Sequence, residues 1–175
     1  MRGFRPRSEG EAISRGEEIT TLPAVARDDR LKNMKVRIYR KDSSVSLPAY
    51  QTNGSVAFDL SPSEDAIIPP HEIRLIPTGL VICTPPGHML VIAARSSTPL
   101  KKGLVIANGI GIIDQDYCGP NDEIRLQVRN FTDKPVEIKK GDRLAQGLFI
   151  PVERAQWEEI KELNGNSRGG FGSTG

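Results

Sequence analysis

Short β-type runs broken by proline and glycine clusters constrain the fold of this chain more than any other feature. From residue 34 to about 150, apolar and polar side chains tend to alternate, which is the period of half-buried strands. The runs are SVAFDL (55–60), EIRLIPTGLVIC (72–83), HMLVIAAR (88–95), GLVIANGIGIID (103–114), EIRLQVRN (123–130) and RLAQGLFIPV (143–152). Turn-forming clusters such as Pro69-Pro70 and Pro85-Pro86-Gly87 separate them. Many short strands without long helices predict an all-β sandwich, barrel or jelly roll.

Shifts in composition predict the domain boundaries. Residues 1–33 are rich in charged residues, Gly and Ser, and we expect them to form a disordered N-terminal tail. The β domain is expected from Met34, where MKVRIYR begins the strand period, to residue 163. Gly and Ser dominate residues 164–175, which predicts a flexible C-terminal arm. Inside the domain, the sequence from Ser96 to Gly103 predicts one short helix, and residues 152–163 are helical by composition.

Charge and cysteine content exclude several classes of protein. The chain of 175 residues has 24 basic and 22 acidic side chains, and a net charge of +2 gives no reason to expect a nucleic-acid partner. No stretch approaches the roughly 18 apolar residues of a membrane span. Two cysteines, Cys83 and Cys118, cannot make a disulfide framework, and without CxxC pairs they argue against a zinc site. A reduced, cytoplasmic setting is the default expectation.

Four motifs carry residues that could do chemistry, although each has a simpler structural interpretation. NGIGIIDQDYCG at 108–119 places aspartates and a tyrosine on what would be one tight hairpin, which could equally be a solvated surface turn. ARSSTP at 94–99 predicts either a helix cap or an anion site. GDRLAQ at 141–146 most simply forms a turn before a strand, with Asp142 and Arg143 pairing locally. GGFGSTG near the end has the composition of a phosphate loop but lacks its lysine. His71 and His88 lie near prolines in expected turns and are not expected to function.

The order and spacing of the motifs are more informative than any one of them. SVAFDL, ARSS, NGIGIIDQDYCG, GDRLAQ and GGFGSTG resemble the five sequence blocks of the dUTP nucleotidohydrolase (dUTPase) family over residues 34–175. This resemblance implies a jelly-roll-like distorted barrel that forms a homotrimer, with active sites at the subunit interfaces. It also implies hydrolysis of dUTP to dUMP and pyrophosphate with Mg²⁺, which limits uracil incorporation into DNA and supplies dUMP for thymidylate synthesis.

The resemblance also implies a role for each matching residue. Asp114 matches the aspartate that orients and deprotonates the attacking water, and Tyr117 matches the tyrosine that packs on deoxyribose. Asn108 matches the asparagine that recognises uracil together with nearby backbone groups, here around Gly111. Asp59 matches the aspartate linked to the water shell of the metal. Phosphate contacts are implied for Arg95, Ser96, Ser97 and Gln146, uracil stacking for Phe171, and wrapping of the phosphates for Gly172, Ser173 and Thr174.

Several positions depart from the family pattern. Ala57 replaces a glycine and Cys118 replaces an arginine, while residues 120–122 are an apparent insertion beside the uracil site. Relatives usually place an arginine five residues before the arm phenylalanine, where this chain has Asn166. We therefore expect Arg168 to bind the γ-phosphate. Because relatives have a strand at residues 152–163, we expect a strand there instead of a helix.

Three alternatives to the enzyme are considered at this point. A purely structural jelly roll would have no reason to carry Asn108 and Tyr117 together with the arm. A non-catalytic relative could bind dUTP as a signalling or interaction module, although retention of Asp114 and the arm favours the enzyme. A dCTP deaminase shares the broad fold. A deaminase would need a basic residue where this chain has Leu100, and a glutamate beyond the glycine of the hairpin where this chain has its Asp-Tyr arrangement. Both differences argue against a deaminase.

Overall fold

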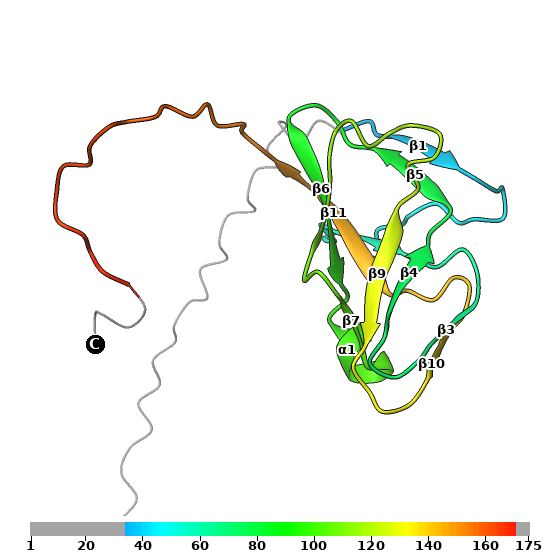
Figure 1. The fold of residues 1–175 in the computed structure, drawn as a ribbon. Helices are drawn as coiled ribbons and strands as arrows, with labels where there is room; N and C mark the ends of the chain where they lie inside the picture. The colour runs from blue at the N-terminus through cyan, green and yellow to red at the C-terminus, as the bar shows by residue number, and fades with distance from the viewer. Residues whose placement is uncertain (1–33, 171–175) are drawn as a thin grey trace, which may run out of the picture. The chain divides into compact units, whose positions relative to one another are not determined.

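The computed structural model describes residues 34–170, which form eleven short strands and one helix (Figure 1). In chain order they are β1 (Arg37–Arg40), β2 (Phe58–Leu60), β3 (Ala66–Ile68), β4 (Ile73–Pro77), β5 (Leu80–Cys83), β6 (His88–Ala94), α1 (Ser97–Lys102), β7 (Leu104–Ile106), β8 (Gly111–Ile113), β9 (Arg125–Asn130), β10 (Val136–Ile138) and β11 (Ala145–Pro151). The all-β prediction is confirmed, and the fold is that of a jelly-roll-like distorted barrel.

All strand pairs in the described part are antiparallel. The largest sheet has the order β2-β11-β6-β8, and a second sheet has the order β4-β9-β7. Two further pairs, β1 with β5 and β3 with β10, complete the arrangement. Side chains from different sheets meet in one core, which includes the fully buried Leu60, Leu90, Leu104 and Ile138. Burial of these apolar side chains is the main stabilising contribution to such a domain.

The expected strand runs are present, but two strands were not predicted and one expected hairpin is absent. Each run named from the sequence contains at least one strand, but β3 and β10, of three residues each, were not predicted. The expected tight hairpin at 108–119 is wrong, because β7 pairs with β9 whereas β8 pairs with β6. Residues between β7 and β8 therefore cross from one sheet to another. This crossing makes β8 an edge strand of the largest sheet.

The predicted helix is confirmed as α1. Gly103 follows it in the left-handed conformation, with φ of 64°, and its N–H donates to the Pro99 carbonyl over 3.0 Å. Ser96 occupies the N-cap position, but its hydroxyl makes no capping hydrogen bond. Between residues 34 and 170 there is no helix of the length and apolarity that crossing a membrane requires.

Residues 152–163 form neither the expected strand nor a helix. The segment leaves the end of β11 and carries no regular structure, and all but Val152 of its residues are exposed (Figure 1). Trp157 is 95% exposed and Leu163 is 88% exposed. A strand needs a partner, and none of the described strands of this chain pairs with these residues.

The expectation of a reduced cysteine pair is wrong for this structure. Cys83, the last residue of β5, is joined to Cys118 by a disulfide, with a Cα–Cα distance of 5.0 Å. That separation lies in the ordinary range for disulfides. The two residues are 35 positions apart in the chain, so only the three-dimensional fold brings them together.

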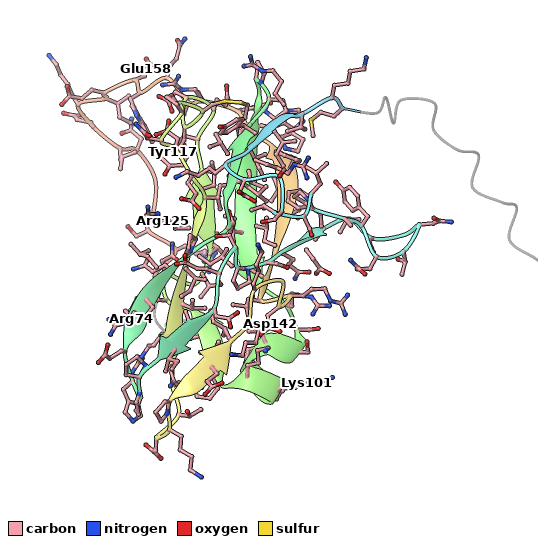
Figure 2. All side chains as sticks on the ribbon, turned by 90° about the vertical axis from the view of Figure 1, so that its right-hand side faces the viewer. Arg74, Lys101, Tyr117, Arg125, Asp142 and Glu158 are labelled. Atoms are coloured by element: carbon pink, nitrogen blue, oxygen red, sulfur yellow. A yellow bond between two sulfur atoms is a disulfide. The ribbon has the colours of Figure 1, made fainter. Side chains whose placement is uncertain are left out.

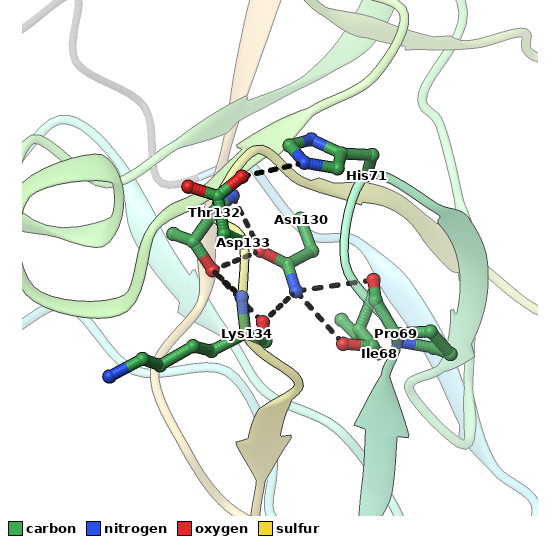
Figure 3. Close-up of polar contacts among 7 residues, drawn as sticks. All are labelled: Ile68, Pro69, His71, Asn130, Thr132, Asp133 and Lys134. Atoms are coloured by element: carbon green, nitrogen blue, oxygen red, sulfur yellow. Dashed lines mark hydrogen bonds and ion pairs between the residues drawn. The ribbon is translucent and has the colours of Figure 1, made fainter.

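Asn130 organises the end of β9 through a buried polar network (Figure 3). The side chain is completely buried, and its Nδ2 lies within 3.1 Å of the carbonyl oxygens of Ile68, Pro69 and Lys134. Its Oδ1 accepts from the Thr132 backbone N–H and hydroxyl at 2.9 and 2.8 Å. The side chain thereby connects the end of β3 to the turn after β9.

An Asn130→Asp substitution is expected to lower the free energy of unfolding by about 3 kcal/mol or more. The new carboxylate would replace the donor that faces three carbonyl oxygens, and a buried group without a partner is costly. The melting temperature should fall by about 10 °C for a chain of this size. Asn53→Asp, which changes an exposed loop residue, is the matched control and should shift by little. Equal melting temperatures for the two variants would contradict the role of the network.

Candidate active site

Three neighbouring strands bring the first group of candidate residues together. Gln146 of β11 lies opposite Asp59 of β2 on one side and Ala93 of β6 on the other. Arg95 directly follows β6, and its backbone N–H donates to the Leu144 carbonyl. The fold therefore places residues from the predicted first, second and fourth blocks at one end of the largest sheet. We call Asp59, Arg95, Arg143 and Gln146 the phosphate cluster.

The carboxylate of Asp59 holds two arginines side by side. Its Oδ1 lies 2.7 Å from Arg95 Nε, and its Oδ2 lies 3.3 Å from Arg143 Nη1. Arg95 Nη1 also donates to the Arg143 carbonyl. Two guanidinium groups share one carboxylate, so a positive charge remains, and each group keeps further N–H donors. Such a pair is suited to phosphate oxygens, which arginine binds through its planar fork.

The expected pairing of Asp142 with Arg143 is wrong, and the contact of Arg143 with Asp59 makes it a candidate site residue that the sequence analysis missed. Asp142 Oδ2 lies 2.7 Å from Lys102 Nζ and 2.9 Å from the Lys139 backbone nitrogen. Burial by itself would raise the pKa of Asp142, but these hydrogen bonds and the charge of Lys102 outweigh it and lower the pKa. Side chains of consecutive residues entering a strand point in different directions, which a local-pairing argument overlooks.

Further donors lie beside the phosphate cluster. Gln146 Nε2 donates to the Ala94 carbonyl at 3.2 Å, which fixes the side-chain amide against β6. The hydroxyl of Thr98 donates to the Leu144 carbonyl at 2.7 Å and anchors the first turn of α1. Ser96 and Ser97 follow Arg95 directly, and the Ser96 hydroxyl is not used as a helix cap. Hydroxyl and amide donors beside two arginines can bind a polyanion.

The second group of candidate residues lies along β8 and the loop after it. Gly111 faces Ile92 of β6 so closely that an added Cβ would lie 3.3 Å from the Ile92 Cβ. Asn108 is exposed in the turn before β8, where Gly109 has a φ of 76°. Because β8 is the edge strand, its outer backbone N–H and carbonyl groups have no pairing strand among the described residues. An exposed row of backbone donors and acceptors can recognise the polar edge of a flat base.

Asp114 and Tyr117 follow β8 in the same loop. Asp114 is exposed and lines a surface pocket of about 520 Å³ together with His88, Gln115 and Arg154. An exposed carboxylate at a pocket can accept a proton from water. Tyr117 is 39% exposed, and its hydroxyl donates to the Glu123 carbonyl at 3.1 Å. That hydrogen bond holds the far end of the ring in place.

The two groups lie at opposite ends of the largest sheet. Ile113 pairs with Leu90, so Asp114 is level with Met89, and Arg95 follows six residues later along the chain. At about 3.3 Å per residue the two are about 20 Å apart. In Figure 2, Tyr117 lies near one end of the domain, and Asp142 lies beside α1 toward the other end. One protomer therefore does not bring Asp114 and Arg95 onto one triphosphate.

The expected arm residues can be placed only in part. Phe171, Gly172, Ser173 and Thr174 lie outside the described residues. Arg168 is exposed, as is every residue from 153 to 170. No ion pair of Arg168 occurs within the part of the chain that the structure describes.

The side chains around Asp59 fit a metal ion that is bound mainly by the phosphate oxygens of a substrate and only indirectly by the protein. Within residues 34–170 no cluster of three or more His, Cys, Asp and Glu side chains could hold an ion. Both oxygens of Asp59 already accept from arginines, which leaves this carboxylate suited to an indirect contact through water. Mg²⁺ commonly binds in this way, keeping several waters while phosphate oxygens supply the other ligands.

Comparison with known proteins identifies the family of this chain. A dUTPase family model matches residues 43–175. The deoxyuridine 5'-triphosphate nucleotidohydrolase of Lactococcus lactis subsp. lactis is 40% identical over 149 residues, which cover 83% of this chain and 99% of the relative. The crystal structure of dUTPase from Streptococcus mutans is 34% identical, with a TM-score of 0.65 over 71% of this chain and all of that chain. Staphylococcus bacteriophage 80alpha dUTPase with dUPNHPP shares the fold, with a TM-score of 0.71 at 21% identity over 81% of this chain and 98% of that chain. This chain belongs to the dUTPase family.

Proposed function

We propose that this enzyme hydrolyses dUTP at sites to which at least two protomers contribute, one supplying Asp114 and another the phosphate cluster. The activity follows from membership of the dUTPase family, and the proposal concerns which residues perform it. The observation that carries it is the separation of about 20 Å between Asp114 and Arg95 along β6. A triphosphate cannot span that distance, so a second copy must supply one of the two groups.

Asp114 acts as the general base in this account. Its carboxylate takes a proton from a water molecule while the water oxygen attacks the α-phosphorus. The bond between the α-phosphorus and the bridging oxygen breaks, and pyrophosphate leaves. Asp114 is suited to this role because it is exposed at a pocket, directly after the strand that we assign to base recognition.

The phosphate cluster stabilises the charge on the triphosphate. Arg95 and Arg143, held by Asp59, would bind phosphate oxygens through their remaining N–H groups, and Ser96, Ser97 and Gln146 would add neutral donors. Mg²⁺ on the triphosphate would supply further charge neutralisation, and Asp59 would contact its water shell. The side chains at this end of the sheet orient the substrate and perform no proton transfer.

Base and sugar selectivity reside in Asn108, the outer edge of β8 and the Tyr117 ring. The outer backbone edge of β8 and the Asn108 amide would pair with uracil, and a base held closely against them would leave no space for the 5-methyl group of thymine. The Tyr117 ring would pack on deoxyribose at the place where a ribose carries its 2′-hydroxyl.

A homotrimer with shared active sites accounts for the C-terminal segment as well. Trp157, Ile160 and Leu163 are exposed by 95%, 58% and 88%. Apolar side chains this exposed are expected to be covered in the assembly. Lying across a neighbouring copy would cover them and would bring the arm with Arg168 and Phe171 over that neighbour's site. The arm would then close over uracil and the γ-phosphate.

The reaction is tested by measuring pyrophosphate release from dUTP, dCTP, dTTP and UTP in the presence of Mg²⁺. We expect release from dUTP alone at a substantial rate. Binding of dUTP without pyrophosphate release would instead support a signalling or interaction module. Ammonia release from dCTP would support a deaminase, and either outcome would contradict the proposal.

Tyr117→Ala is expected to narrow the preference for dUTP over UTP by about 5- to 150-fold. This range corresponds to the roughly 1–3 kcal/mol that burying an unpaired 2′-hydroxyl would cost in the original enzyme. The measurement is the ratio of kcat/KM for the two nucleotides. Tyr39→Ala, which changes an exposed tyrosine of β1, is the matched control and should leave the ratio unchanged. An unchanged ratio in Tyr117→Ala would remove this residue from sugar selection.

A further inference from the structure

The disulfide between Cys83 and Cys118 fastens the loop that carries Asp114 and Tyr117. Cys83 closes β5, whose Leu80, Val81 and Ile82 are buried in the body of the domain. Cys118 directly follows Tyr117. The bond therefore ties the loop to a strand whose position is fixed by the core.

The loop has only weak anchors besides this bond. Residues 114–117 are all exposed. Side-chain hydrogen bonds join this stretch and the preceding Ile113 to the domain: from Thr84 to the Ile113 carbonyl at 3.4 Å, from Gln115 to the His88 carbonyl at 3.1 Å, and from Tyr117 to the Glu123 carbonyl at 3.1 Å. The Gln115 hydrogen bond is exposed and the other two are only partly buried, and single hydrogen bonds of this kind contribute little net stability. Apart from the main chain itself, the disulfide is the one covalent link between the loop and the rest of the described domain.

We propose that Cys83 and Cys118 are a reversible redox modification site that controls how firmly the substrate-binding loop is held. This inference rests on the proposed role of Tyr117. In the disulfide form the Tyr117 ring has a fixed position, and in the dithiol form the loop samples positions that do not bind deoxyribose. The pair thus couples the thiol balance of the surroundings to dUTP affinity.

The chemistry needs a small-molecule disulfide as co-reactant, for which glutathione disulfide is the probe. One cysteine thiolate attacks a sulfur of the probe, which forms a mixed disulfide and releases one glutathione thiolate. The second cysteine thiolate then displaces the other glutathione, and the two protons from the cysteines protonate the two leaving thiolates. The protein loses two electrons and the probe gains two. Both cysteines are partly exposed, so a small molecule can reach them.

Reduction is expected to raise the KM for dUTP by about three- to tenfold while kcat changes less than twofold. The apparent Kd equals the intrinsic Kd divided by the fraction of time that the loop spends in the binding position, so a mobile loop raises the KM. A change in KM with little change in kcat distinguishes a positioning role from a general loss of folded protein, which would lower the apparent kcat. The preference for dUTP over UTP should narrow in the same state.

The test compares the full-length protein after treatment with glutathione disulfide or with a phosphine reductant. Alkylation and mass spectrometry count the free thiols, hydrogen exchange reports the protection of residues 112–118, and pyrophosphate release gives kcat and KM. Oxidised protein should have no free thiols, a more protected loop and the lower KM. Cys83→Ser and Cys118→Ser are matched controls, and both should keep the higher KM under either treatment.

Three results separate failure of this inference from failure of the proposed function. Equal KM values and equal loop protection in the two thiol states would overturn the redox site, as would two free thiols after treatment with glutathione disulfide. Absence of dUTP hydrolysis in both states would overturn the proposed function, and hydrogen exchange would then decide the redox site alone. The comparison of thiol states uses the unmutated protein, so it holds even if a serine variant does not fold.

Discussion

Asp114→Asn is expected to lower kcat for dUTP by about 10²- to 10⁴-fold, the usual contribution of a general base. The amide has the size of the carboxylate but cannot take a proton from the attacking water. Substrate affinity should stay nearly unchanged, because the proposed phosphate contacts come from Arg95, Arg143 and their neighbours. The measurements are kcat from pyrophosphate release and the Kd of a non-hydrolysable dUTP analogue from calorimetry.

Asp116→Asn is the matched control for this experiment. Asp116 lies two residues further along the same exposed loop and carries the same charge. Its substitution changes the local electrostatics equally but removes no proposed base, so kcat should stay within about threefold of the wild type. If Asp114→Asn turns over dUTP at nearly the wild-type rate, the assignment of the base is wrong.

Removal of the arm by ending the chain at Leu163 is expected to reduce kcat/KM by about 10³-fold or more, and Arg168→Ala should approach that loss. Ordering the arm costs roughly 1–2 kcal/mol of backbone entropy per residue, which contacts with the substrate must offset. Stacking by Phe171 can supply only part of this. An arginine on the γ-phosphate is the strongest contact left, and such arginines contribute about 10³- to 10⁵-fold in other phosphoryl-transfer enzymes.

Asn166→Ala is the control variant with which the loss of kcat/KM in Arg168→Ala is compared. Asn166 occupies the position where relatives usually have the arginine, and Gly165, Gly169 and Gly170 surround the two residues with flexible backbone. This freedom is the reason to expect that Arg168 reaches the γ-phosphate from its displaced position. Asn166→Ala should therefore be mild. A severe loss in Asn166→Ala with a mild one in Arg168→Ala would mean that the arm closes without an arginine contact.

Local features of the fold were predictable from the sequence because their signals are local. The cap-to-glycine pattern from Ser96 to Gly103 predicted α1, and the alternation in residues 123–130 predicted β9 with Leu126 and Val128 buried. By contrast, β3 and β10 have three residues each, which is too short for an alternating pattern to stand out. The long-range pairing of β8 with β6 also leaves no local trace, so a hairpin was expected instead.

In the candidate site, too, local motifs were predictable from the sequence whereas long-range contacts were not. The five blocks identified the family and supplied the candidate residues, but no block indicates which other blocks it contacts in the folded chain. Arg143 was assigned a local partner, whereas Asp59, 84 residues away, is its partner in the fold. Cys83 and Cys118 showed no pairing signal for the same reason. The distance between Asp114 and Arg95 required the register of β6 and β8.

Mixing two inactive variants tests the central claim, that protomers share each site, most directly. Asp114→Asn and Arg95→Ala chains, with different affinity tags, are co-expressed in equal amounts and the mixed assemblies are isolated. If neighbouring copies supply Asp114 and Arg95, one of the three sites in every mixed trimer has both intact residues, so about a third of wild-type activity should return in the isolated mixed assemblies. If one protomer supplied both residues, every site would lack one of them. Activity no greater than the residual activities of the two variants would then contradict the shared site.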